Sequence, residues 1–89
     1  MVSQQTTISN KLGLHARAAA KLVALAASSP CDVFVQKDDR QVNAKSIMGI
    51  MMLAASKGTL ITVSAEGEDA ELAVKNIIQL IDDKFGEGE

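Results

Sequence analysis

The spacing of apolar residues divides the chain into strand-like and helix-like segments. Apolar positions that alternate with a period of two predict strands, and apolar positions that recur every three to four residues predict helices. Breaker residues such as Gly13, Pro30 and Gly58 separate the segments. The pattern predicts strands over 6–9, 31–37, 40–43 and 59–65, and helices over 16–28, 47–54 and 70–85.

The connection between the second and third predicted strands indicates the fold class. Asp38-Asp39 is a tight-turn signal, and a two-residue turn joins antiparallel strands. Elsewhere strands alternate with helices. The order strand, helix, strand, strand, helix, strand, helix therefore predicts an α+β fold, with a mostly antiparallel sheet that carries its helices on one face.

The composition is that of one domain, residues 1–89, with an aliphatic core. Apolar residues make up 47% of the chain but aromatic residues only 2%, so the core depends on aliphatic side chains and methionine. Asp69 is placed to cap the last predicted helix, and residues 86–89 are expected to form a frayed tail. The expected buried stripe of that helix consists of Ala70, Val74, Ile77, Ile78, Ile81 and Phe85.

Charge and cysteine content exclude several classes of function. The net charge is −2 and the nine Lys and Arg residues are scattered, so the basic face of a nucleic-acid-binding domain is missing. The apolar run 47–55 is too short to span a membrane, and the first ten residues carry no leader signal. Cys31 is expected to be a core residue in a reducing compartment, and one His with one Cys does not suffice for a zinc site. We therefore expect a soluble cytoplasmic protein without membrane insertion.

The single histidine, His15, lies where a strand-like stretch gives way to the first predicted helix. If His15 is the N-cap, the backbone N–H groups of Ala16, Arg17 and Ala18 have no partner within the helix. These donors, the helix dipole and the guanidinium of Arg17 would together suit a phosphoryl group carried on the imidazole. The alternative is a partly exposed loop histidine that has no functional role. No carboxylate is near His15 in the sequence, so a Ser-His-Asp type of site is not supported.

The short predicted helix after Ser46 is apolar on all sides. Ser46 is expected at its N-cap, where capping is the simplest role of the hydroxyl and phosphorylation is the alternative. The side chains expected to face the core are Ile50, Leu53 and Ala54. Those expected to remain partly exposed, as an adaptable docking surface, are Ile47, Met48, Met51 and Met52. A deeply buried helix in a methionine-filled core fits the periodicity equally well.

The motifs Gly13-Leu14-His15-Ala16-Arg17 and Asn43-Ala44-Lys45-Ser46-Ile47-Met48-Gly49, their separation, and Lys57-Gly58-Thr59 carry a resemblance to a known family. They resemble HPr, the histidine-containing phosphocarrier family of the bacterial phosphoenolpyruvate-dependent phosphotransferase system. The resemblance extends over nearly the whole chain. It implies an open-faced β-sandwich, in which three helices cover one face of a four-stranded antiparallel sheet.

The resemblance also implies roles for individual residues. The residue matching His15 accepts a phosphoryl group on Nδ1 from enzyme I and passes it to enzyme IIA, and the residue matching Arg17 assists. Such a protein is a carrier rather than a stand-alone turnover enzyme, and it uses no cofactor or metal. Ser46 matches a regulatory site of an HPr kinase/phosphorylase. The partner-binding surface is expected to comprise Ala20, Ile47, Met48, Met51 and Met52.

One position departs from the pattern of the family. Ala18 stands where many relatives have proline; alanine restores one N–H donor and favours the helix, so we expect function to be retained. Two alternatives stay open. One is the NPr branch, which serves nitrogen-related regulation, and the other is a purely regulatory binding module that acts through Ser46 and the surface over 47–52.

Overall fold

Strands and helices alternate along residues 1–87, the part of the chain that the computed structural model describes. Their succession is the predicted one, and the ends of several elements differ from the prediction. The elements are β1 (Val2–Thr7), α1 (Ala16–Ala27), β2 (Asp32–Lys37), β3 (Arg40–Asn43), α2 (Ile47–Met52), β4 (Leu60–Glu66), α3 (Ala70–Asp82) and the 3₁₀ turn η1 (Lys84–Gly86).

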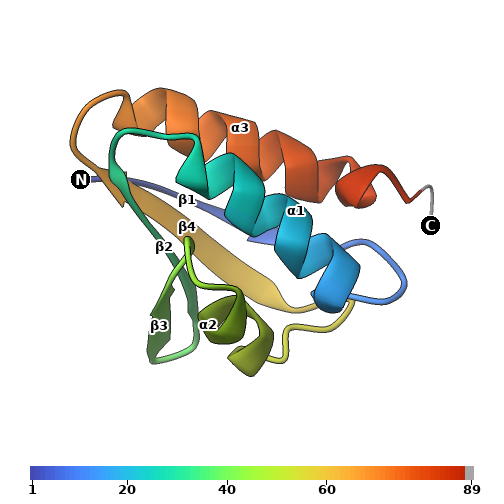
Figure 1. Ribbon diagram of the computed structural model, residues 1–89. Coiled ribbons are helices and arrows are strands. Elements are labelled where there is room, and N and C mark those ends of the chain that lie inside the picture. Colours follow the sequence, from blue (N-terminus) through green and yellow to red (C-terminus); the bar gives the residue numbers. More distant parts are fainter. Residues whose placement is uncertain (88–89) are drawn as a thin grey trace.

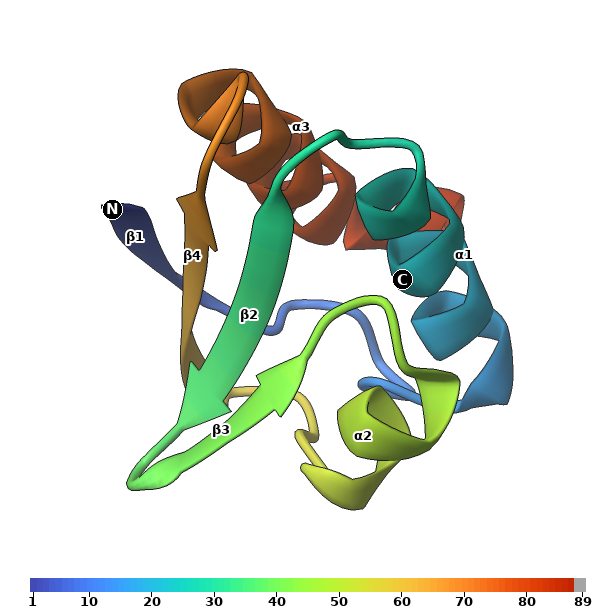
Figure 2. The ribbon, with the colours of Figure 1, turned by 60° about the vertical axis from the view of Figure 1, so that its left-hand side comes forward.

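The four strands form one antiparallel sheet in the order β1-β4-β2-β3. Lys37 pairs with Arg40, so Asp38-Asp39 forms the predicted two-residue turn, with Asp38 at φ 54°. The three helices cover one face of the sheet and leave the other face open (Figures 1 and 2). The predicted α+β open-faced β-sandwich is therefore confirmed.

Strand β1 extends further toward the N-terminus than the pattern of apolar residues predicts. It begins at Val2, four residues before the predicted start, and ends at Thr7, so Ile8 and Ser9 of the predicted strand lie outside it. It pairs with β4 from Val2 opposite Ala65 to Thr7 opposite Leu60. Ser3, Gln4 and Gln5 are all exposed. This part of the strand is held by backbone pairing with β4 rather than by an apolar face, because strand formation depends strongly on the partner strand.

The core lies between the sheet and the helices. All six residues of the predicted α3 stripe are buried, none more than 9% exposed, and Cys31 is a buried free thiol as expected. Burial at this scale removes large aliphatic side chains from water, which is the main favourable contribution to folding. The largest fully buried aliphatic side chains outside α3 are Ile8, Leu22, Val33, Val35, Ile50, Ile61 and Val63.

Three details of the helix ends differ from the prediction. Ala54 does not face the core: α2 ends at Met52, and Ala54 is exposed with φ 52°. Asp69 precedes α3 but does not cap it, because its backbone is left-handed (φ 59°) and its side chain makes no cap bond. Helix α3 ends at Asp82 rather than at Phe85.

The prediction that residues 86–89 form a frayed tail is wrong for Gly86 and Glu87. Gly86 closes η1, and the backbone N–H of Glu87 donates to the carbonyl of Lys84 at 3.0 Å. Residues 88 and 89 lie outside the described part of the chain. Across residues 1–87, no helix combines the length and apolar character needed to cross a bilayer.

Candidate functional site

The loop between β1 and α1 is fastened to the segment before β4. The backbone N–H of Leu14 donates to the carbonyl of Ala55 at 2.9 Å, and that of Ile8 donates to Thr59 at the same distance. Gly13 has φ +66°, and a Cβ at this position would lie 2.6 Å from the carbonyl oxygen of Ala55. Only glycine allows this close approach, so Gly13 sets the point at which the chain enters α1.

His15 is the N-cap residue of α1, as predicted. Its backbone is extended (φ −72°, ψ 174°), its carbonyl accepts the first helical bond from Ala19 at 2.8 Å, and its ring does not cap the helix. The side chain is 27% exposed. Among residues 1–87, the N–H groups of Ala16, Arg17 and Ala18 have no acceptor, so three backbone donors stand open beside the imidazole.

A pocket of about 360 Å³ opens beside His15. Arg17 is exposed and makes no ion pair or hydrogen bond within residues 1–87, so its guanidinium is available to an anion. A larger hollow of about 640 Å³ lies at the start of α3, but its lining contains neither histidine nor cysteine, so it offers no comparable nucleophile. The pocket at the histidine is lined by Lys11, Leu12, His15, Arg17, Lys21, Gly86 and Glu87.

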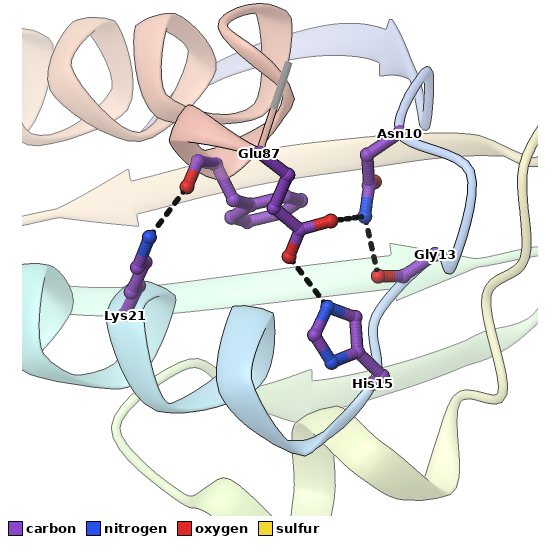
Figure 3. Close-up of polar contacts among 6 residues, drawn as sticks. Asn10, Gly13, His15, Lys21 and Glu87 are labelled. Carbon is purple, nitrogen blue, oxygen red and sulfur yellow. Dashed lines mark hydrogen bonds and ion pairs between the residues drawn. The ribbon is translucent and has the colours of Figure 1, made fainter. Parts of the chain in front are cut away.

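The structure adds a carboxylate that the sequence did not indicate. Glu87 Oε2 lies 2.5 Å from Nε2 of His15, and Glu87 Oε1 accepts a hydrogen bond from Nδ2 of Asn10 at 3.0 Å. The same amide donates to the carbonyl of Gly13 at 2.8 Å, so Glu87, Asn10 and the loop before His15 form one network (Figure 3). His15 and Glu87 are 72 positions apart, and no local pattern in the sequence could have paired them.

The turn after α3 places Glu87 beside His15. Lys84 and Phe85 are both left-handed, with φ 55° and 54°, so the regular helix is interrupted and the chain turns after Asp82. Phe85 is 1% exposed, and its carbonyl accepts a hydrogen bond from Nζ of Lys21 at 2.6 Å (Figure 3). Burial of the aromatic ring offsets the cost of two left-handed residues, roughly 1–2 kcal/mol each.

The hydrogen bonds to Glu87 favour its ionised form. Those from His15 and Asn10 lower the pKa of the Glu87 carboxyl below its ordinary value, and the positive charge of Lys21 acts in the same direction. Glu87 is therefore ionised at neutral pH. The other ring nitrogen, Nδ1 of His15, points away from the carboxylate and has no partner among residues 1–87 (Figure 3).

Helix α2 packs against α1 (Figure 2). It carries the predicted exposed apolar side chains. Ile50 and Leu53 are buried as expected, and the alternative of a wholly buried helix is wrong. Ser46 is the N-cap, and its Oγ accepts a hydrogen bond from the N–H of Gly49 at 3.1 Å. The exposed apolar side chains are Ile47, Met48, Met51 and Met52, with Met48 the most exposed at 69%.

The fold and the site together define a class: small open-faced β-sandwich proteins that present one histidine at the start of their first helix. The family model described as "PTS HPr component phosphorylation site" matches residues 2–83. The chain belongs to this HPr family, the phosphocarrier proteins of the phosphotransferase system. Within residues 1–87, no group of three His, Cys, Asp or Glu side chains is arranged to hold a metal ion.

Individual relatives agree with this assignment. The phosphocarrier protein HPr of Cupriavidus necator is 51% identical over 89 residues and is matched along the whole of both chains. The phosphocarrier protein NPr of Shewanella violacea is 41% identical over 86 residues, which cover 97% of this chain and 94% of that protein. Among solved structures, an HPr from Thermoanaerobacter tengcongensis superposes with a TM-score of 0.94 at 49% identity, covering 98% of each chain.

Proposed function

We propose that Nδ1 of His15 accepts a phosphoryl group from enzyme I and passes it to an enzyme IIA component. The observation that carries the proposal is the position of the imidazole: at the start of α1, partly exposed, with Nδ1 unpartnered among residues 1–87. A ring nitrogen with a free lone pair and no partner can attack phosphorus, whereas a ring bonded through both nitrogens cannot.

The groups around His15 suit the phosphoryl oxygens. The open N–H donors of Ala16, Arg17 and Ala18 and the positive end of the helix dipole favour an anion at this point. The guanidinium of Arg17 adds a forked donor for two oxygens. Alanine at position 18 supplies an N–H that proline would lack, so function is expected to be retained there; its side chain is fully buried.

The exposed apolar side chains of α2 and the exposed Ala20 on α1 support a docking surface for both partners. The two helices lie side by side, so a partner seated on Met48 and Met51 can also reach His15. Methionine adapts to different apolar surfaces, which suits a carrier that visits a donor and then an acceptor. Contacts of this kind are expected to be small and short-lived.

Phosphorylation of the purified protein by enzyme I and phosphoenolpyruvate tests the proposal. The native protein should gain the mass of one phosphoryl group in an acid-labile linkage. His15→Ala should gain none, and Arg17→Ala should be labelled more slowly but at the same site. Full acid-labile labelling of His15→Ala would contradict the proposal.

Ser46 carries a second proposed role, regulation by a kinase of the HPr kinase/phosphorylase type. Ser46 is exposed and begins the helix that bears the docking surface, so a phosphate there would add about two negative charges beside Met48. A pull-down that compares native protein with Ser46→Asp tests this role, with Ser46→Asn as the neutral control. Identical partners for all three proteins would contradict it.

The HPr branch is favoured over the NPr branch by the motif around Ser46 and by the higher identity to HPr relatives. Comparing the rates of phosphorylation by the donors of the sugar and nitrogen-related systems tests this preference. Faster transfer from the nitrogen-related donor would reverse it.

A further inference from the structure

The carboxylate of Glu87 restricts which ring nitrogen of His15 carries the proton. An ionised carboxylate has no hydrogen to donate, so the 2.5 Å contact with Nε2 requires that Nε2 carry the proton. In a neutral imidazole only one nitrogen is protonated, and Nδ1 then keeps its lone pair. Nδ1 is the ring nitrogen that faces away from Glu87 and has no partner among residues 1–87 (Figure 3).

We propose that Glu87 is a positioning residue for phosphoryl transfer: it holds His15 as the Nε2–H tautomer and stabilises the imidazolium that forms when Nδ1 takes the phosphoryl group. The inference rests on the proposed function of His15. It assigns a role to a side chain that lies beyond the matched family region, residues 2–83.

The charge balance of the transfer explains the need for a carboxylate. The lone pair of Nδ1 forms a bond to phosphorus while the bond from phosphorus to the donor's leaving atom breaks and its electron pair leaves with the donor. No proton leaves His15 in this step, so the ring becomes a phosphorylated imidazolium with its positive charge shared with Nε2–H. Glu87 is in hydrogen-bond contact with that proton, and a charge-assisted bond is stronger than a neutral one.

The same contact supports transfer to the acceptor. A phosphorylated ring that keeps its Nε2 proton leaves as a neutral imidazole when the phosphoryl group departs. By holding this proton, Glu87 keeps the ring a good leaving group. The carboxylate and the phosphoryl group are on opposite edges of the ring, so attraction at contact distance outweighs repulsion across the ring.

Asn10 fixes the carboxylate in this orientation. The amide is fully buried, and its Nδ2 bridges Glu87 Oε1 and the carbonyl of Gly13. Rotating the amide by half a turn would set its oxygen against both acceptors, so the observed orientation is the only favourable one. Lys21 holds the same turn through the carbonyl of Phe85. The loop that places His15 therefore also places its carboxylate partner.

Phosphorylation rates of Glu87→Gln and Glu87→Ala test the role, with Asp83→Asn as the matched control. Asp83 is exposed on the same turn, and its side chain makes no bond to His15 or Asn10. Two donors are used: phosphorylated enzyme I, and phosphoramidate, which needs no docking surface. With both donors Glu87→Ala should react roughly 10- to 100-fold more slowly, the range of one charge-assisted hydrogen bond. Glu87→Gln should be intermediate, because it keeps an acceptor but loses the charge.

Nitrogen-15 NMR of the imidazole provides a second readout that a purely structural role would not change. The native protein and Asp83→Asn should show a single Nε2–H tautomer, with phosphate on Nδ1 after reaction. Glu87→Ala should show a mixture of tautomers while its backbone spectrum stays native. Native-like rates for Glu87→Ala, faster rates, or a loss confined to enzyme I would each overturn the proposal. Failure of the proposed function is distinct, since the native protein itself would then not be labelled at His15.

Discussion

Replacing Gly13 with alanine is expected to destabilise the protein through two effects that can be separated. A Cβ at this position would lie 2.6 Å from the carbonyl oxygen of Ala55 and 2.8 Å from Cα of Ser56, both of them backbone atoms. Ordinary van der Waals contact begins at 3.4 Å, so the carbonyl would have to recede by about 0.8 Å in a closely packed region.

The magnitude follows from these contacts. A non-glycine residue at φ +66° costs roughly 1–2 kcal/mol, and loss of the bond from Leu14 to the displaced Ala55 carbonyl costs about 0.5–1.5 kcal/mol. We expect Gly13→Ala to lower the free energy of unfolding by about 2–3 kcal/mol. Gly58→Ala is the matched control, because Gly58 has φ +92° but nothing within 4 Å of the added Cβ.

Urea unfolding followed by far-ultraviolet circular dichroism provides the measurement, since the chain has no Trp or Tyr for fluorescence. Gly58→Ala should show only the backbone strain, about 1–2 kcal/mol. The difference between the two variants is then the contribution of the contact with Ala55 and Ser56. If Gly13→Ala loses no more stability than Gly58→Ala, the argument that close approach requires glycine at position 13 is refuted.

Three further predictions concern other parts of the molecule. Ser46→Ala should lower the free energy of unfolding by about 1 kcal/mol, because the N-cap hydrogen bond from Gly49 is lost. Ser46→Asn, which can still cap the helix, should keep the native free energy of unfolding in the same urea assay. The folded protein lowers the pKa of Glu87, so the carboxylate contributes stability that is present above the ordinary value of 4.5 and is lost as the pH falls through the folded value. The urea midpoints of native protein and Glu87→Gln should therefore converge on acidification; a difference that is independent of pH would contradict this. Met48→Glu should slow labelling by enzyme I but leave both stability and reaction with phosphoramidate unchanged, and equal slowing with both donors would argue against a docking role.

Most of the fold followed from local patterns because each pattern matched its environment. The alternation of Ile61, Val63 and Ala65 predicted a strand with one buried face, and all three side chains are buried. Strand β1 was underestimated because Ser3, Gln4 and Gln5 carry no apolar alternation, and their strand conformation comes from pairing with β4. A pattern within one segment does not report what a distant strand imposes on it.

The site was predicted in part for the same reason. His15, Arg17 and the open N–H groups belong to one helix start, so the sequence brings them together by itself. Glu87 and Asn10 come close to His15 only through the tertiary structure. The turn that places Glu87 there has Lys84 and Phe85 in the left-handed conformation, which neither Lys nor Phe favours. Because residues 86–89 were interpreted as a frayed tail, the contact between His15 and the carboxylate of Glu87 was not predicted.

The network around His15 can form only when the two ends of the chain have come together in the folded protein. Its two defining bonds join residues 72 and 77 positions apart, and the closing of a loop of this length costs more conformational entropy than the closing of a short one. During synthesis, His15 leaves the ribosome long before Glu87 exists. A partly folded chain therefore contains His15 without its carboxylate partner, so formation of the contact between His15 and Glu87 can serve as a probe for completion of the native structure.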